Sequence, residues 1–355
     1  MLIGVDARDL APGHGGGEEL YLRNVLKTIR TLQSAIRFLI ITTPANHDSF
    51  DGWERLCIDE GAQTFRERLR RRKCPIAQPA QEAGVDALFM AVDRASSKGA
   101  APLILYALEL IRWEIAFKRM GWLQKTRLNR MAQTCLNAAA IIAPSEFIQH
   151  RLLRLFGVPL DKVTVAPLGV RDTFGQPQPC IVERPYLLFV GTTRPTKNIR
   201  RFRKALYRLR DEIAHTLVVV GRAGEAEPKE WGSRVVRIEQ CPEAQLAGLY
   251  QHCDLFVCPS VYEGSGVTVL EAMRAGARVT AGRVGGIPEV AGDVPTYFNP
   301  ESVDSMVGVI RRALNEKEDE REQRKRTAQN RAAQFTWEKC AERTLAAFRR
   351  VRVGV

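Results

Sequence analysis

The strongest constraint on the fold is a regular alternation of short apolar runs with helical patterns, which occurs in two successive series. The first series begins at Leu2–Ala7 and ends at Val163–Ala166. The second begins at Tyr186–Val190 and ends at Tyr297–Phe298. Such alternation is typical of parallel sheets covered by helices on both faces. The sequence therefore predicts an α/β protein with two Rossmann-like, doubly wound domains that face across a cleft.

The boundary between the two series is marked by composition. Residues 170–185 carry three prolines and little hydrophobic periodicity, which favours a linker. We therefore expect an N-terminal domain over 1–169 and a second domain over 186–335. Residues 336–355 are expected to form a last helix. A chain of 355 residues has the length of two ordinary domains.

The most informative loop of the chain lies within residues 259–271, after an apolar run at 254–258 that predicts a strand and before a helix whose end at Gly276 fits a left-handed C-cap. Gly264 and Gly266 let the backbone approach a ligand closely, and the helix that follows offers free N–H groups to phosphate. Glu263 on the loop can accept hydrogen bonds from hydroxyls, and Glu271, about two turns into the helix, can reach another part of the same ligand. Phosphate and hydroxyl recognition together indicate a nucleotide sugar.

Two further loops follow strands that open a series. The loop Gly191–Asn198 carries Lys197 and Arg194, cations that could meet a diphosphate at the neighbouring helix N-terminus. The loop Pro12–Gly17 is rich in glycine, but Glu18 occupies the last position of a Gly-x-Gly-x-x-Gly frame, so a dinucleotide fingerprint is absent. A glycine loop at a sheet edge indicates a binding crevice, and a flexible turn is the alternative.

The net charge of +13, from 53 basic and 40 acidic residues, suggests an anionic partner. The densest basic run is Arg66–Lys73, which is either a solvated helix face or a contact for an anionic membrane surface. The aromatic residues around Trp113 also have two interpretations, a packed core face or a contact with lipid headgroups. The charge is not accompanied by a nucleic-acid-binding motif, so we expect no nucleic acid partner.

Location and metal content are also expected from the sequence. No apolar run is long enough to span a bilayer, and the start of the chain lacks the pattern of a secretory signal. We expect a cytoplasmic protein, with peripheral association at the inner face of the cell membrane as an extension of that expectation. The eight cysteines and five histidines form no ligand spacing, so we expect reduced thiols and no metal site.

Several stretches together resemble the family 4 retaining glycosyltransferases, which have the GT-B architecture of two Rossmann-like domains. The likeness spans nearly the whole chain and is densest from Tyr186 to Asn299. The stretches that carry it are Gly4-Val-Asp-Ala-Arg8, Ala143-Pro-Ser-Glu-Phe147, Arg194-Pro-Thr-Lys-Asn198, Glu263-x7-Glu271 with Ala272-Met-x-Ala-Gly276, and Gly285-Gly-Ile-Pro-Glu-Val290. The terminal Phe335-Thr-Trp-Glu338 is similar to the family's last helix, which packs back onto the first domain.

The resemblance implies a role for each matching residue. Lys197, with Arg194 beside it, would stabilise the departing diphosphate, Glu263 would face the donor sugar, and Glu271 would accept the ribose hydroxyls. It also implies that no cofactor or divalent metal is needed, because the lysine and the helix dipole neutralise the diphosphate. The backbone positions expected to border the donor are Gly15, Gly16, Gly17, Gly264, Ser265, Gly266, Val267 and Thr268.

The sequence departs from the family pattern at three places. Thr192 or Thr196 stands where the family has a second cation, so Arg194 is the candidate to replace it. Ser265 replaces the usual phenylalanine of Glu-Gly-Phe-Gly and changes the wall near the sugar. Tyr106 followed by alanine replaces a His-Asp pair on the acceptor side, where His14 could compensate.

These observations predict a metal-independent enzyme that transfers a hexosyl-type sugar, with retention, from a nucleotide diphosphate sugar. The acceptor would be a glycan or a lipid-linked molecule of bacterial surface polysaccharide or lipopolysaccharide synthesis. One alternative is a different enzyme on the same architecture, such as a sugar phosphorylase or a nucleotide-sugar epimerase. Another is a catalytically degenerate GT-B module that only binds a nucleotide sugar or glycan.

Overall fold

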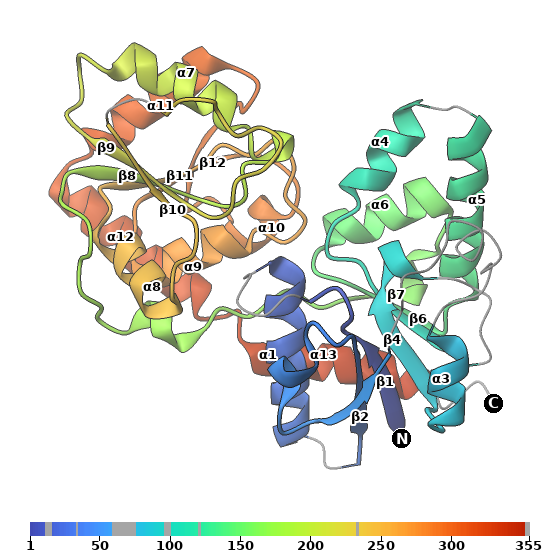
Figure 1. Ribbon diagram of the computed structural model, residues 1–355. Coiled ribbons are helices and arrows are strands. Elements are labelled where there is room, and N and C mark those ends of the chain that lie inside the picture. Colours follow the sequence, from blue (N-terminus) through green and yellow to red (C-terminus); the bar gives the residue numbers. More distant parts are fainter. Residues whose placement is uncertain are drawn as a thin grey trace. The chain divides into compact units, whose positions relative to one another are not determined.

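The computed structural model describes residues 1–10, 16–32, 35–58, 76–95, 101–119, 122–231 and 234–351. The chain divides into two compact units. The first contains Met1–Pro167 together with Trp337–Val355, and the second contains Leu168–Thr336. Each unit is a parallel sheet flanked by helices (Figure 1).

The first unit is built on a seven-stranded sheet with the order β3-β2-β1-β4-β5-β6-β7. Every pair in it is parallel. The strands are β1 (Leu2–Asp6), β2 (Arg37–Thr42), β3 (Glu54–Cys57), β4 (Ala87–Ala91), β5 (Leu103–Tyr106), β6 (Ala140–Ala143) and β7 (Val163–Val165). The helices are α1 (Gly17–Leu32), η1 (His47–Phe50), α3 (Ala77–Glu82), η2 (Val92–Arg94), α4 (Ile111–Arg119), α5 (Trp122–Asn137), α6 (Glu146–Phe156), η3 (Leu160–Lys162) and α13 (Trp337–Arg350).

The last helix, α13, contributes to the core of this first unit although it lies at the far end of the chain. Phe348 is fully buried, and its ring meets that of Phe89 on β4 edge-to-face, with centroids 5.1 Å apart. Phe38 on β2 packs against Phe348 at 6.3 Å. Cys340 and Leu345 of the same helix are also buried. An apolar face of α13 is therefore one wall of the first core.

The second unit has a six-stranded parallel sheet with the order β10-β9-β8-β11-β12-β13. The strands are β8 (Tyr186–Val190), β9 (Thr216–Val220), β10 (Val235–Ile238), β11 (Leu255–Cys258), β12 (Val279–Gly282) and β13 (Thr296–Phe298). The helices are η4 (Asp172–Gly175), η5 (Pro195–Lys197), α7 (Ile199–Leu209), α8 (Glu243–His252), α9 (Val267–Ala275), α10 (Ile287–Ala291), α11 (Val303–Leu314) and α12 (Glu318–Ala332).

Two apolar layers fill this second unit, one on each face of the sheet. One layer joins α7 and α11 to the alternate strand residues Leu187 and Phe189. The other joins α8, α9 and α12 to Tyr186 and Leu188, which point the opposite way. Figure 1 shows the same helices on the two faces. Because successive strand residues face opposite sides, a strand such as β8 is apolar throughout.

The fold class predicted from the sequence is confirmed, since both sheets are parallel and both are covered by helices. The predicted helix after Gly266 is also present, and it ends at Gly276, whose φ of 80° is the expected left-handed C-cap. The edge strand β3 was not predicted, because its sequence Glu-Arg-Leu-Cys has almost no apolar pattern. An edge strand that is partly exposed needs little apolar surface.

The segment 170–185 differs from a free linker. Phe174 is fully buried in the core of the second unit. A Cβ added to Gly248 on α8 would lie 2.3 Å from the carbonyl oxygen of Pro179, so this segment packs tightly against α8. The prolines and weak periodicity of this segment gave no indication that it packs against the second unit. Its contacts are with residues about seventy positions further along the chain.

Several sequence expectations concern charged and polar surfaces. The charged helix α12 carries ion pairs between residues three positions apart, at Arg321–Glu318 and Lys325–Glu322. The basic run Arg66–Lys73 lies outside the described residues. Among the described helices, none combines the length and the apolar character needed to cross a membrane. The cysteines of the described part of the chain are all unpaired thiols.

We predict that Phe348→Ala strongly destabilises the first unit. The substitution removes a fully buried ring that contacts β2 and β4, and such truncations cost about 3–5 kcal/mol in the free energy of unfolding. Denaturant unfolding followed by circular dichroism should show an early transition for the first unit. Arg349→Ala, at an exposed neighbouring position on α13, is the control. Equal midpoints for the two variants would contradict this account of α13.

Candidate functional site in the second unit

The order of strands in the second sheet reverses between β8 and β11, which are direct neighbours. The chain leaves β8 at Val190 and runs to one side of the sheet, whereas the chain that leaves β11 at Cys258 runs to the other. The loops that follow these two strands therefore separate at the same carboxyl edge. Ligands of open parallel sheets bind at such a reversal.

At this edge the structure brings together two of the residues predicted from the sequence. The ammonium nitrogen of Lys197 lies 2.6 Å from Oε1 of Glu263. The hydroxyl of Ser260 donates to the same oxygen at 2.6 Å. Glu263 is 8% exposed. A buried carboxylate requires such partners, because an unpaired charge in a low-dielectric site is costly.

Asn198 fixes the loop that carries Lys197. Its backbone has a φ of 57°, the left-handed region that asparagine tolerates. Its buried side-chain amide donates to the carbonyl oxygens of Pro259 at 3.0 Å and Pro300 at 2.7 Å. One side chain thus joins the loops that follow β8, β11 and β13. The family motif includes this residue, but its two acceptors lie 61 and 102 positions away and could not be read from the motif.

The backbone of Glu263 is held by the turn before α10. Its carbonyl oxygen accepts a hydrogen bond from the amide of Gly286 at 2.9 Å. A Cβ added to Gly285 would lie 1.9 Å from that same oxygen, and Gly285 has a φ of 59°. Only glycine fits there, both for space and for conformation. The Gly285-Gly286 pair of the motif therefore positions Glu263.

The N-terminus of α9 lies directly after this loop. Gly266 has a φ of 71° and precedes the first helical turn, which contains Val267 and Thr268. The first amides of a helix have no intrahelical acceptors, and its dipole places positive charge there. Gly264 is buried and Ser265 is half-buried, so the loop presents backbone more than side chains. This end of α9 is suited to phosphate.

Glu271, on the same helix, is 5% exposed and is already bound by protein groups. Its Oε1 lies 3.1 Å from Nη2 of Arg171, and the hydroxyl of Tyr250 donates to its Oε2 at 3.4 Å. Burial raises the pKa of Glu271, and the charge of Arg171 opposes that rise. Arg171 also pairs with Glu243 at 2.7 Å. A carboxylate has about four acceptor positions, so room remains for ligand hydroxyls.

Sequence reasoning missed Arg171 and Tyr250 for a physical reason. Arg171 lies in the segment interpreted as a linker, and it reaches Glu271 across 100 positions of sequence. The sequence does show one indication of such a partner. Glu271 lies among apolar residues of α9, and a buried carboxylate needs a cation nearby. That signal predicts a partner but does not identify it.

The remaining predicted residues are placed as follows. Arg194 is exposed at the start of η5, on the same loop as Lys197. Gly16 and Gly17 lie at the start of α1 in the first unit. Gly15 and His14 lie outside the described residues. Within the part of the chain that the structure describes, no group of three or more His, Cys, Asp or Glu side chains could hold a metal ion.

An open hollow of about 500 Å³ lies beside this edge of the second sheet. Its lining comes from the loop after β11 and from the end of β13, with Val261, Tyr297 and Pro300 among its residues. Arg283 also lines it. This volume is within the range of small-molecule sites. The carboxyl edge thus offers space next to the loop that carries Glu263.

The first unit has its own polar cluster at the corresponding reversal, between β1 and β4. The hydroxyl of Tyr106 donates to Glu18 at 2.6 Å and accepts from Nη2 of Arg94 at 2.9 Å. Arg94 also pairs with Glu18 and with the buried carboxylate of Asp6, the latter at 3.3 Å. Burial, followed by the charge of Glu18, raises the pKa of Tyr106 well above its ordinary value. Tyr106 is therefore a protonated hydrogen-bond donor.

Two units of this kind in one chain, each with strand order reversing at its centre, define the GT-B class of α/β proteins. The family "Glycosyl transferases group 1" matches residues 171–331, and the family "Glycosyltransferase Family 4" matches residues 85–174. From residue 85 to residue 331 the chain thus matches these two glycosyltransferase families.

Individual relatives agree with this assignment. The O-antigen chain mannosyltransferase B of Escherichia coli is 29% identical over 233 residues, which are 60% of this chain and 61% of the relative. The match thus spans less than two thirds of the relative's length. Sucrose-phosphate synthase from Thermosynechococcus elongatus has the same fold, with a TM-score of 0.77, 18% identity and full coverage of both chains. Anabaena Alr3699/HepE, solved with UDP and glucose, gives a TM-score of 0.74 at 16% identity, over 98% of this chain and 99% of that one.

We predict that Glu271→Gln gains stability relative to the wild type as pH rises above 4.5, the ordinary pKa of the group. Because burial raises the pKa in the folded protein, ionisation above that pH favours the unfolded chain. Glutamine keeps the shape and cannot ionise. Denaturation midpoints measured across the pH range should diverge in this direction, with the exposed Glu239→Gln as the control. If the stability of the wild type rises relative to that of the variant as pH rises, the ion pair with Arg171 outweighs the cost of burying the charge.

Proposed function

We propose that this protein is a retaining glycosyltransferase that moves a sugar from a nucleotide diphosphate sugar to a glycan or lipid-linked acceptor in bacterial surface polysaccharide synthesis. The observation that carries the proposal is the Lys197–Glu263 ion pair, which lies at the carboxyl edge beside the N-terminus of α9. A cation, a helix N-terminus and a carboxylate are the groups that a diphosphate sugar needs.

In this proposal Lys197 neutralises the diphosphate as it leaves. In the structure that ammonium lies 2.6 Å from Glu263. A diphosphate at the first turn of α9 would offer Lys197 a second anion, and Glu263 would then be available to the sugar hydroxyls. Charge that develops on the leaving group is thus met by a preorganised cation and by helix amides, an arrangement worth roughly 3–4 kcal/mol per donor in other enzymes.

Glu271 would bind the ribose of the nucleotide. It lies in the second turn of α9, one to two turns beyond the amides that would bind phosphate. The ion pair with Arg171 keeps this buried carboxylate in a fixed orientation. Because its remaining acceptor positions are directed by that pair, hydroxyls and not a second anion are the expected ligands.

The relatives support the substrate class. The name of the E. coli relative states transfer of mannose to O-antigen chains, and the Anabaena structure holds UDP and glucose. We propose that this chain likewise uses a nucleoside diphosphate hexose and acts without a divalent metal. An acceptor built on a membrane lipid would be consistent with the net charge of +13 and with peripheral association at the inner membrane face.

A binding module without catalysis is the second candidate, and one observation favours it. The position where the family has a histidine is occupied by Tyr106, whose hydroxyl is fully engaged by Glu18 and Arg94. A group held in that way cannot supply the same chemistry as an imidazole. Slow hydrolysis of the donor in the absence of any acceptor would identify an enzyme and exclude the silent module.

We predict that Lys197→Ala lowers sugar transfer by about 10²–10³-fold in kcat, because it removes the cation that meets the leaving group. Release of nucleoside diphosphate from the donor is the measurement. Lys204→Ala, which removes an exposed lysine from α7 of the same unit, is the matched control. Glu263→Ala should also be impaired. Transfer by either site variant at a rate near that of the wild type would contradict the proposal.

The donor itself can be identified by binding. We expect thermal stabilisation and a calorimetric signal from one nucleotide among UDP, GDP and their hexose conjugates, with equal affinity whether magnesium or a chelator is present. Glu271→Ala should weaken binding of the nucleotide through loss of the ribose contact. Stabilisation by no nucleotide would overturn the donor assignment, and strict dependence on magnesium would overturn metal independence.

A further inference from the structure

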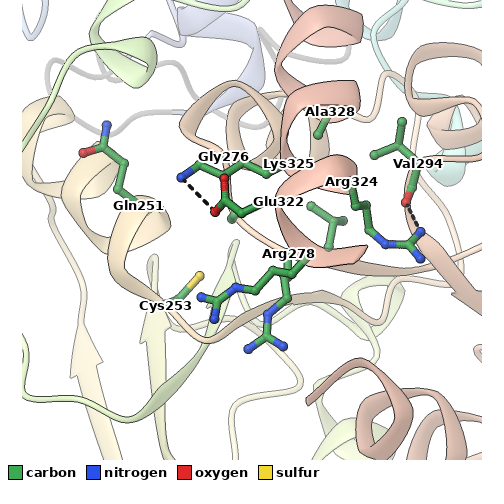
Figure 2. Close-up of a pocket in the computed structure, with 12 residues that line it drawn as sticks. Gln251, Cys253, Gly276, Arg278, Val294, Glu322, Arg324, Lys325 and Ala328 are labelled. Carbon is green, nitrogen blue, oxygen red and sulfur yellow. Dashed lines mark hydrogen bonds and ion pairs between the residues drawn. The ribbon is translucent and has the colours of Figure 1, made fainter. Parts of the chain in front are cut away.

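A second, basic pocket lies in the same unit, at the edge of the sheet where the strands begin. The site described above lies at the opposite edge, where the strands end. The pocket is bordered by the residues that link α9 to β12 and by one side of α12. Figure 2 shows Arg278, Glu322 and Lys325 gathered beside α12, with Arg324 turned toward Val294. Its lining contains four cations, Arg278, Arg321, Arg324 and Lys325, and one carboxylate, Glu322.

The pocket is separate from the Lys197–Glu263 site. Gly276 and Arg278 follow the C-terminus of α9, whereas the loop with Glu263 precedes its N-terminus. A helix of nine residues is about 14 Å long. Arg278 also enters β12 at its amino end, while the site described above lies at the carboxyl ends of the strands. A ligand in this pocket therefore occupies a different place from the sugar donor.

Arg278 reaches this pocket from its position just before β12. Its guanidinium donates to the carbonyl oxygen of Ala313 at 2.7 Å. Its Nε is buried and has no hydrogen-bond partner among the described residues. Burial lowers the pKa of Arg278 and the nearby charge of Arg321 lowers it further, while the carboxylates of Asp254 and Glu316 oppose that shift. Two guanidinium groups are thus held near each other, an arrangement that an anion would relieve.

Arg324 on α12 is held by Glu316 at 2.7 Å and by the carbonyl oxygen of Val294 at 3.1 Å, whereas the carboxylate partners of Arg321 and Lys325 are distant or exposed. Arg321 lies 3.3 Å from Glu318, whose side chain is 71% exposed. Lys325 lies 3.7 Å from Glu322. Exposed pairs of this kind contribute little to stability and break easily. Both side chains can turn to an anion at small cost.

Capping of the α9 C-terminus does not account for this much charge. The negative end of a helix dipole is equivalent to about half an elementary charge. Apart from Arg324, which Glu316 neutralises, the lining holds three cations and one carboxylate, which is more positive charge than that end requires. The cavity is about 60 Å³, several times the roughly 10–15 Å³ that holds one water molecule. A tetrahedral oxyanion fits such a space, and guanidinium groups recognise it through paired hydrogen bonds.

We propose that the pocket formed by Arg278 and the basic face of α12 is a binding site for a phosphate group, distinct from the donor site. The phosphate would bridge the start of β12 to α12 and so tie that helix to the sheet. The same chemistry is offered by free phosphate, by a soluble phosphate monoester and by a phospholipid headgroup. The inference is independent of the catalytic proposal, because none of its residues takes part in that site.

The test uses the full chain and inorganic phosphate as the probe. Calorimetry and thermal unfolding at constant ionic strength, with chloride replacing phosphate, should show saturable binding and a rise in Tm. Arg321→Gln should weaken binding at least about ten-fold, because a charge-assisted contact is lost. Arg278→Gln should do the same. Arg208→Gln, which removes an equal charge from an exposed position on α7, should bind phosphate like the wild type.

Phosphate binding at the donor site would mimic this result and is separated by two further measurements. Binding should persist in Lys197→Ala and in the presence of saturating UDP. Loss of phosphate binding in Lys197→Ala, or displacement by UDP, would overturn the proposal. So would an effect of phosphate no larger than that of chloride, or equal affinity in Arg321→Gln and the wild type. Because Arg321 is on a partly exposed helix face, its variant remains informative if Arg278→Gln fails to fold.

The source of the phosphate is identified by a parallel experiment with vesicles. Flotation with phosphatidic acid vesicles, compared with neutral phosphatidylcholine vesicles, measures headgroup binding. Capture that is reduced in Arg321→Gln and competed by free phosphate would identify a lipid headgroup. Saturable phosphate binding without vesicle capture would identify a soluble phosphate compound. Capture that is unchanged in Arg321→Gln would place membrane binding elsewhere on the chain.

Discussion

The reversal of strand order between β8 and β11 is the constraint on which the second unit depends. It lets two loops part at one edge of the sheet and still keeps Lys197 within 2.6 Å of Glu263. Removing one partner of a buried ion pair costs roughly 3–5 kcal/mol, and less where one partner is partly exposed, as Lys197 is. The Asn198 amide and the turn at Gly285 and Gly286 support the pair through the backbone. Asn198 donates to the carbonyl oxygen of Pro259, and the amide of Gly286 donates to that of Glu263.

The site keeps its charges in a state that is unfavourable without ligand. Glu271 is buried on an apolar helix, and its raised pKa means that the folded protein resists its ionisation. Arg171 offsets part of that cost and is itself shared with Glu243. A protein selected only for stability would place an apolar side chain at this position. The function we propose gives this carboxylate a role, because it assigns Glu271 to the ribose of the donor.

Prediction from sequence succeeded where the determinants are local. The strand at 255–258, the helix after Gly266 and its C-cap at Gly276 follow from apolar runs and glycines within a few residues. It did not find Arg171, because the partner of that residue lies 100 positions away and the surrounding segment has the composition of a linker. The edge strand at 54–57 was missed for a related reason. It is held by backbone pairing with β2, which its own four side chains do not reveal.

The two units use the same topological device for different chemistry. In the second unit, Lys197 is half-buried and pairs with Glu263, and in the proposed function a ligand anion takes the place of that carboxylate. In the first unit, Arg94 is shared among the carboxylates of Asp6, Asp9 and Glu18 and the hydroxyl of Tyr106. Arg8 also pairs with Asp6 at 2.8 Å, so three carboxylates meet two cations, and the cluster disfavours phosphate and can accept hydrogen bonds from hydroxyl groups. Anion recognition is thus the chemistry that we propose for this edge of the second unit, and hydroxyl recognition is the chemistry that the Arg94 cluster of the first unit can offer.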